Sequence, residues 1–275
     1  MGIGTLSSVS DVTLGAQENV HRLTRLMRSE QDREFLSIRS KERVSDVGEV
    51  FTPDSCVISM MDLDHLRELS YHLCSTFLEP SCGTGNFLVE ILARKLAVAI
   101  YAYRAGIADL DLLILQAVAT VYGVDIMFDN VHESRSRLLQ LVEYAYSYIM
   151  ANEQSTDGEV TEVAMPSSLK KNVNYILKTN IIFGDMLKFE MAKSEPDTKH
   201  SKKAVALSLS ELSDDNKDEM YFIKREFSLD GTVKQTAIAA KPEDTILGNT
   251  IVCNYSKLYA TDLDELTGEH DILGV

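Results

Sequence analysis

Residues 76–87, with the sequence TFLEPSCGTGNF, decide the fold of this chain. An apolar run ends at Glu79, a proline and two glycines follow, and from Phe87 to Ile100 apolar residues recur every three to four positions. This order predicts a short buried strand, a tight turn that needs glycine, and an amphipathic helix. Free backbone amides at the start of such a helix face the turn, where they can bind a ligand.

The same alternation of strand and helix continues along the chain. Residues 121–126 form a second apolar run, a helical stripe extends from Val131 to Ile149, and residues 180–185 form a third apolar run. Residues 106–118 are apolar without a breaker and predict one further helix. Strands that alternate with helices predict an α/β fold with a Rossmann-like, doubly wound parallel sheet.

Changes of composition divide the chain into four parts. We expect an N-terminal arm and helix in residues 1–45, the Rossmann-like domain in residues 46–187, and a polar insertion or linker in residues 188–219. Residues 220–275 are expected to hold a hairpin that turns at Asp230-Gly231 and a final strand at the chain end. Residues 246–259 fit a helix and a strand equally well.

The composition limits the classes of function. The 275 residues include 27 Lys and Arg against 42 Asp and Glu, and the net charge of −15 is too acidic for a protein whose main surface is a nucleic-acid groove. The chain has neither an apolar run of membrane-spanning length nor a signal-peptide pattern, so we expect a cytoplasmic protein without a membrane contact. The four cysteines form no CxxC pair, which argues against zinc and predicts reduced thiols.

The glycine turn can be compared with two nucleotide-binding patterns. A dinucleotide fold expects a third glycine, where this chain has Leu88, and an acid about 20 residues on, whereas Asp125 follows Gly85 by 40 residues. A phosphate-binding P-loop needs Lys followed by Ser or Thr, but Asn86-Phe87 stands there. NAD is therefore disfavoured and ATP hydrolysis is not expected. Asp125, at the end of the second strand, is suited to binding the hydroxyls of a ribose.

Four ordered motifs carry a family resemblance: FTP (residues 51–53), EPSCGTGNF (79–87), YGVD (122–125) and GD (184–185). In content and order they resemble the amino-terminal half of the adenine-specific DNA methyltransferases of restriction-modification systems and phages. The resemblance implies the Rossmann-like fold of the S-adenosylmethionine-dependent methyltransferases, with S-adenosylmethionine as the cofactor. It would make the chain the cofactor-binding part of an enzyme that methylates the amino group of adenine.

The resemblance also assigns roles to individual residues. Residues 51–53 would close over the methionine end of the cofactor, Glu79 and the 81–85 backbone would hold its amino-acid portion, and Asp125 would bind the ribose. Asp185 would accept a hydrogen bond from the cofactor adenine. Cys82 fits a small loop residue better than a nucleophile. The full set of expected cofactor-binding residues is Phe51, Thr52, Pro53, Glu79, Pro80, Ser81, Cys82, Gly83, Gly85, Asn86, Phe87, Asp125, Ile126, Asp185 and Met186.

One part of the family pattern is missing. The family holds its flipped adenine with an Asn-Pro-Pro-Tyr or Asn-Pro-Pro-Phe loop after the fourth strand, and no Asn-Pro-Pro occurs in this chain. Residues 271–274 (DILG) match the strand that precedes the loop, so the chain is expected to stop before it and to have no catalytic residue of its own. A truncated frame, a gene split into two chains, and a member that lost catalysis all fit this sequence.

The family resemblance also implies binding partners. DNA would be reached through a missing C-terminal region or a partner chain, and a complementary methyltransferase or restriction subunit is a further partner. The alternative function is a non-catalytic, methyltransferase-like regulatory or interaction subunit of a restriction-modification system. A third possibility, mimicry of DNA by the negative charge, leaves the ordered motifs unexplained.

Overall fold

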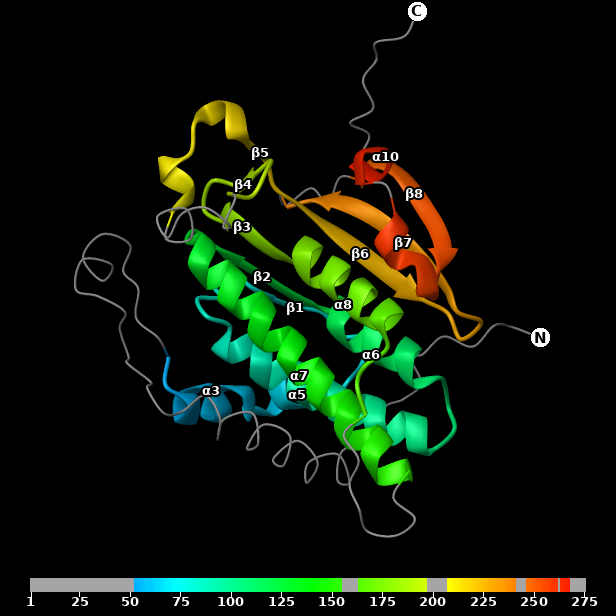
Figure 1. The fold of residues 1–275 in the computed structure, drawn as a ribbon. Coiled ribbons are helices and arrows are strands. Elements are labelled where there is room, and N and C mark those ends of the chain that lie inside the picture. The colour runs from blue at the N-terminus through cyan, green and yellow to red at the C-terminus, as the bar shows by residue number, and fades with distance from the viewer. Residues whose placement is uncertain (1–51, 155–162, 197–206, 241–245, 262, 268–275) are drawn as a thin grey trace, which may run out of the picture.

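The computed structural model describes residues 52–154, 163–196, 207–240, 246–261 and 263–267 (Figure 1). The expected N-terminal helix, Phe51 and the expected final strand at residues 270–275 lie outside these residues. Within them no helix is both long and apolar enough to cross a membrane. The architecture is mixed α/β, with a five-stranded sheet, a three-stranded sheet and several helices.

The first part of the chain builds the parallel half of the larger sheet. Helices α3 (Asp54–Met61) and α4 (Asp64–Ser70) precede β1 (Phe77–Glu79), and α5 (Asn86–Arg104) and α6 (Leu110–Ala119) lead to β2 (Val121–Asp125). Helices α7 (Phe128–Gln154) and α8 (Ser167–Asn180) lead to β3 (Ile181–Asp185). Strand β2 pairs in parallel with β1 on one side and β3 on the other, so all three carboxyl ends lie at one edge.

The sheet is parallel only over these three strands, which corrects the expectation of a parallel sheet throughout. Strand β4 (Glu190–Ala192) is antiparallel to β3, and β5 (Lys217–Glu219) is antiparallel to β4. Only residues 186–189 join β3 to β4, and so short a connection permits a hairpin but no crossover. The 188–219 segment thus contributes two strands, and Leu209 of its 3-10 helix η3 (Leu209–Glu211) is buried. A second 3-10 helix, η4 (Asp214–Asn216), precedes β5.

The second sheet follows directly. Strands β6 (Tyr221–Phe227) and β7 (Thr232–Ala239) form the predicted hairpin with Asp230 and Gly231 in its turn, and β8 (Ile246–Asn254) pairs with β7. The range 246–259, ambiguous in sequence, forms β8 and most of the 3-10 helix η5 (Tyr255–Ala260). Helix α10 (Leu263–Thr267) packs Leu266 against this sheet.

The two faces of β2 and β3 are covered by different elements. Val121, Ile181 and Phe183 belong to the core formed with the helices, whereas Val124 and Ile182 pack against Met220, just before β6. The alternation of side chains along a strand explains this division. Helices therefore cover one face and the start of β6 covers the other, so the described part is not wound with helices on both faces (Figure 1).

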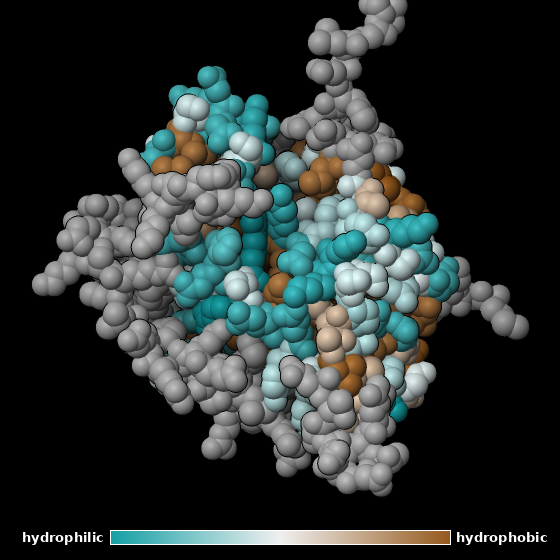
Figure 2. Space-filling model, in the orientation of Figure 1, coloured by the Kyte–Doolittle hydropathy of each residue, from teal (hydrophilic) through white to brown (hydrophobic). Residues whose placement is uncertain are grey.

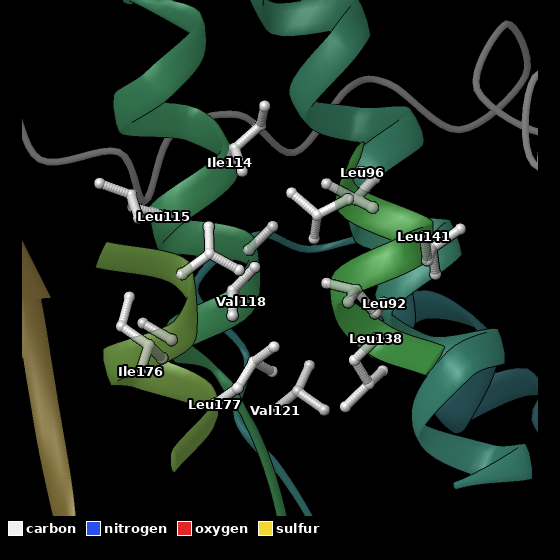
Figure 3. Close-up of a cluster of buried hydrophobic side chains, with 14 of the residues drawn as sticks. Leu92, Leu96, Ile114, Leu115, Val118, Val121, Leu138, Leu141, Ile176 and Leu177 are labelled. Carbon is white, nitrogen blue, oxygen red and sulfur yellow. The ribbon is translucent and has the colours of Figure 1, made fainter. Parts of the chain in front are cut away.

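Apolar side chains from four helices fill the main core. In Figure 3 they point toward one another between α5, α6, α7 and α8, with Val121 of β2 below them. The outward surface of α7 and α8 is mainly hydrophilic (Figure 2). The core therefore fixes the distance between α5 and α7, the two helices that begin at the carboxyl edge of the sheet. The labelled core residues are Leu92, Leu96, Ile114, Leu115, Val118, Leu138, Leu141, Ile176 and Leu177.

Candidate cofactor-binding site

Three acidic residues end the three parallel strands at one edge of the sheet. Glu79 closes β1, Asp125 closes β2 and Asp185 closes β3. Asp125 pairs in register with Phe183, and Glu79 pairs with Gly123, so Asp125 extends two residues beyond the end of β1. The sheet edge therefore carries three carboxyl groups, and Glu79 leads directly into the loop that follows β1.

The loop between β1 and α5 is held by hydrogen bonds at both ends. The Cys82 amide donates to the Val124 carbonyl (2.9 Å), and the Gly85 amide donates to the Cys82 carbonyl (2.8 Å). Gly83 and Gly85 have φ angles of 51° and 87°, the left-handed region that glycine adopts without strain. A β carbon on Gly85 would lie 2.9 Å from Ser134 Oγ, so this position has no room for a side chain. Pro80 and Ser81 are exposed at the outer side of the loop.

Asp125 fastens this loop to the end of β2. Its Oδ2 accepts a hydrogen bond from the Gly83 amide (2.8 Å), and its Oδ1 accepts from the Met127 amide (2.8 Å) and Asn130 Nδ2 (3.1 Å). The residue is only 6% exposed. The carboxylate that the sequence assigns to a ribose is thus a structural acceptor in this conformation.

Two side chains of α7 that the sequence motifs do not include also bind the loop. Ser134 Oγ donates to the Gly83 carbonyl (2.8 Å), and Arg137 Nη1 donates to the Thr84 carbonyl (2.6 Å) and to Asn86 Oδ1 (2.8 Å). Their spacing of three residues places both on one face of the helix. That spacing could have indicated a shared contact, but polar residues three positions apart on a helix more often face solvent than a loop.

The segment before α3 also reaches this loop. Asn86 Nδ2 donates to the Thr52 carbonyl (2.9 Å), and Pro53 precedes the first turn of α3. Buried Arg94 of α5 anchors α3, because its guanidinium donates to the Met61 carbonyl (2.8 Å) and pairs with Asp62 (2.9 Å). Thr52 and Pro53 therefore lie beside the start of α5, although Thr52 and Asn86 are 34 positions apart in sequence.

The structure places the last three expected residues differently. Asp185 Oδ1 accepts from the backbone amides of Leu187 (2.9 Å) and Lys188 (3.3 Å), so its carboxylate closes its own turn. The Ile126 carbonyl accepts from the Leu209 amide (2.8 Å), so η3 covers the end of β2. Met186 lines an apolar groove on the opposite face of the sheet, away from the glycine loop.

Burial governs the ionisation of two groups near the loop. Burial raises the pKa of the Glu79 carboxyl, and the Ser81 backbone amide acts in the opposite direction. Burial, together with the negative charge of Asp125, raises the pKa of the Cys82 thiol far above its ordinary value. A thiol that stays protonated is a poor nucleophile, which agrees with the interpretation of Cys82 as a loop residue.

The arrangement suits a small ligand that carries hydroxyl or amino groups. Gly83, Asn86 and Phe87 are partly exposed at the start of α5, in and after the loop that Glu79 precedes. Among the described residues no cluster of three or more His, Cys, Asp or Glu could hold a metal ion.

Comparison of the chain with protein-family models, curated proteins and solved structures finds no match.

Proposed function

We propose that this chain is the S-adenosylmethionine-binding part of an adenine-specific DNA methyltransferase, with a Rossmann-like core and a cytoplasmic location. The observation that carries the proposal is the joining of three motifs distant in sequence. Thr52 contacts Asn86, and the Gly83 amide contacts Asp125, so the residues of the first three motifs meet at one edge of a parallel sheet. That edge is where open α/β sheets bind nucleotides.

Each residue has a chemical reason for its place in this proposal. The Glu79 carboxylate suits the amino group of the methionine moiety, and the backbone of residues 81–85 can approach a ligand closely because its glycines carry no side chain. Asp125 suits the ribose, although its carboxylate must first exchange a protein partner. Asp185 suits an exocyclic amino group, and the turn it holds keeps it at the edge. When bound, the cofactor supplies an electrophilic methyl group.

This chain contains no Asn-Pro-Pro sequence, so it lacks the residues that would hold a flipped adenine. The proposal therefore gives it the role of holding the methyl donor, and a partner chain or a C-terminal region would bring DNA.

Binding of S-adenosylhomocysteine by calorimetry tests the proposal. The Asp125→Ala variant is a poor probe, because it removes three internal hydrogen bonds as well as any ligand contact. Glu79→Gln keeps the shape of the side chain and removes its charge, so we expect a tenfold to hundredfold weaker affinity, the range for one charge-assisted hydrogen bond (~1.5–3 kcal/mol). Glu68→Gln, at an exposed position in α4, is the matched control and should leave affinity unchanged. A folded wild-type protein that gives no heat with either cofactor form would refute the proposal.

One observation favours the alternative, a non-catalytic interaction subunit. Strand β1 ends the order of the described sheet, and beside it Leu78, Tyr122 and Phe222 line an apolar groove of about 370 Å³. Leu78 is 44% exposed. An open strand edge beside apolar surface favours the addition of a strand from another chain. Co-elution with a chain that begins at an Asn-Pro-Pro motif, without restored methylation, would favour this function over a split enzyme.

A further inference from the structure

The Gly83–Asp125 hydrogen bond uses the same atoms that the proposed cofactor requires. The Gly83 amide and Asp125 Oδ2 are 2.8 Å apart, and the Met127 amide and, in α7, Asn130 Nδ2 already donate to Oδ1. A carboxylate oxygen has about two lone pairs for hydrogen bonds. Since Asp125 is also almost fully buried, ribose hydroxyls cannot approach both oxygens in this conformation.

We infer that this hydrogen bond is a self-closed state of the site, and that Asp125 exchanges the Gly83 amide for ligand hydroxyls when the cofactor binds. The inference rests on the proposed function and concerns the regulation of that same site. Ser134 is then a positioning residue, because its hydroxyl donates to the Gly83 carbonyl and thereby stabilises the closed state.

Gly83 is the partner of Asp125 that can move. Met127 and Asn130 are buried at the start of α7, whereas Gly83 is partly exposed in the loop. The loop stays anchored without Gly83, because the Cys82 amide bonds the Val124 carbonyl and the Gly85 amide bonds the Cys82 carbonyl. Glycine populates positive and negative φ about equally, so the peptides on either side of Gly83 can rotate with little strain.

The closed state should reduce the apparent affinity by a predictable factor. A hydrogen bond to a charged group shifts the equilibrium roughly tenfold to hundredfold toward the closed state, and the apparent dissociation constant rises by the same factor. The neutral bond from Ser134 Oγ to the Gly83 carbonyl adds about two- to tenfold. Removing the Ser134 hydroxyl should therefore increase affinity, whereas a residue that only shapes the bound site would decrease it.

The test compares Ser134→Ala with Ser70→Ala in the full chain, with S-adenosylhomocysteine as the probe. Both serines are fully buried and both hydroxyls donate to a backbone carbonyl, but Ser70 lies in α4 and donates to Arg67. We expect Ser134→Ala to raise the association rate and the affinity about two- to tenfold, with an unchanged dissociation rate. Ser70→Ala should change neither. Unchanged or lower affinity of folded Ser134→Ala would overturn the inference while leaving the proposed function intact.

A second measurement needs no folded variant at Ser134. In wild-type protein labelled with 15N-glycine, saturating S-adenosylhomocysteine should shift the Gly83 amide proton strongly, because it loses a carboxylate acceptor. Gly106 is the internal reference: it lies in an exposed turn, and no atom of the described residues comes within 4 Å of where its β carbon would stand. Bound ligand with an unmoved Gly83 signal would overturn the exchange alone. Absence of binding by the folded wild-type protein would refute the proposed function and the exchange together.

Discussion

Replacing Lys95 with methionine should remove a dependence of stability on pH that the wild-type protein shows between pH 6 and pH 9. The Lys95 side chain is completely buried in α5. Its ammonium group donates to the carbonyls of His72 (2.8 Å) and Ser75 (2.6 Å), in the segment that leads into β1, and lies 5.4 Å from the centre of the Phe77 ring. Burial lowers the pKa of Lys95 to about 7, and the neighbouring Cys74 acts in the opposite direction.

Proton binding by Lys95 in the folded and unfolded states determines whether the free energy of unfolding rises or falls with pH. Between pH 7 and the ordinary lysine pKa, the unfolded chain keeps the Lys95 proton and the folded chain loses it. The free energy of unfolding therefore rises with pH in this window. Each pKa unit corresponds to about 1.4 kcal/mol, so Lys95 should add about 2 to 3 kcal/mol of stability between pH 6 and pH 9.

Urea unfolding monitored by circular dichroism at pH 6, 7, 8 and 9 measures this slope. Lys95→Met also leaves backbone carbonyls without a donor, so the absolute stability falls and the difference between the two slopes is the readout. Lys234→Met, at an exposed lysine on β7, measures the effect of removing one surface charge. Equal slopes for wild type and Lys95→Met would refute the reasoning about Lys95.

Two further substitutions test the packing of β2 against α5 and of β6 against α8. A β carbon in Gly123→Ala would lie 2.8 Å from Leu88 Cδ1, so we expect a loss of about 1 to 3 kcal/mol in urea unfolding, and an unchanged midpoint would contradict the tight contact between β2 and α5. Arg225→Lys replaces a buried guanidinium that donates hydrogen bonds to three side chains at once. The loss of this branched donor should lower the free energy of unfolding by about 2 to 3 kcal/mol. Stability equal to that of Lys224→Met, at the exposed neighbouring position, would contradict a stabilising role of these hydrogen bonds. The three acceptors are Gln235, Asn180 and Thr179.

Local patterns predicted the elements on which the site is built. The run into Glu79, the two glycines and the apolar stripe from Phe87 give β1, its loop and α5, and Asp230-Gly231 gives the turn of the β6–β7 hairpin. These features depend on neighbours in sequence: side-chain periodicity, and backbone angles that glycine adopts easily. Parallel pairing then requires Glu79, Asp125 and Asp185 to share an edge, so part of the site could be predicted as well.

The partners of those residues were decided by tertiary structure. The sequence could not show that β4 turns back antiparallel on β3, that β6 rather than a helix covers the face of Val124, or that Met186 joins that face. It also could not show that Asp125 bonds Gly83, because a carboxylate accepts any donor that packing brings within about 3 Å. The sequence determined that Glu79, Asp125 and Asp185 stand at the sheet edge. Only the packing of α7 against the loop decided that Asp125 is already hydrogen-bonded to Gly83.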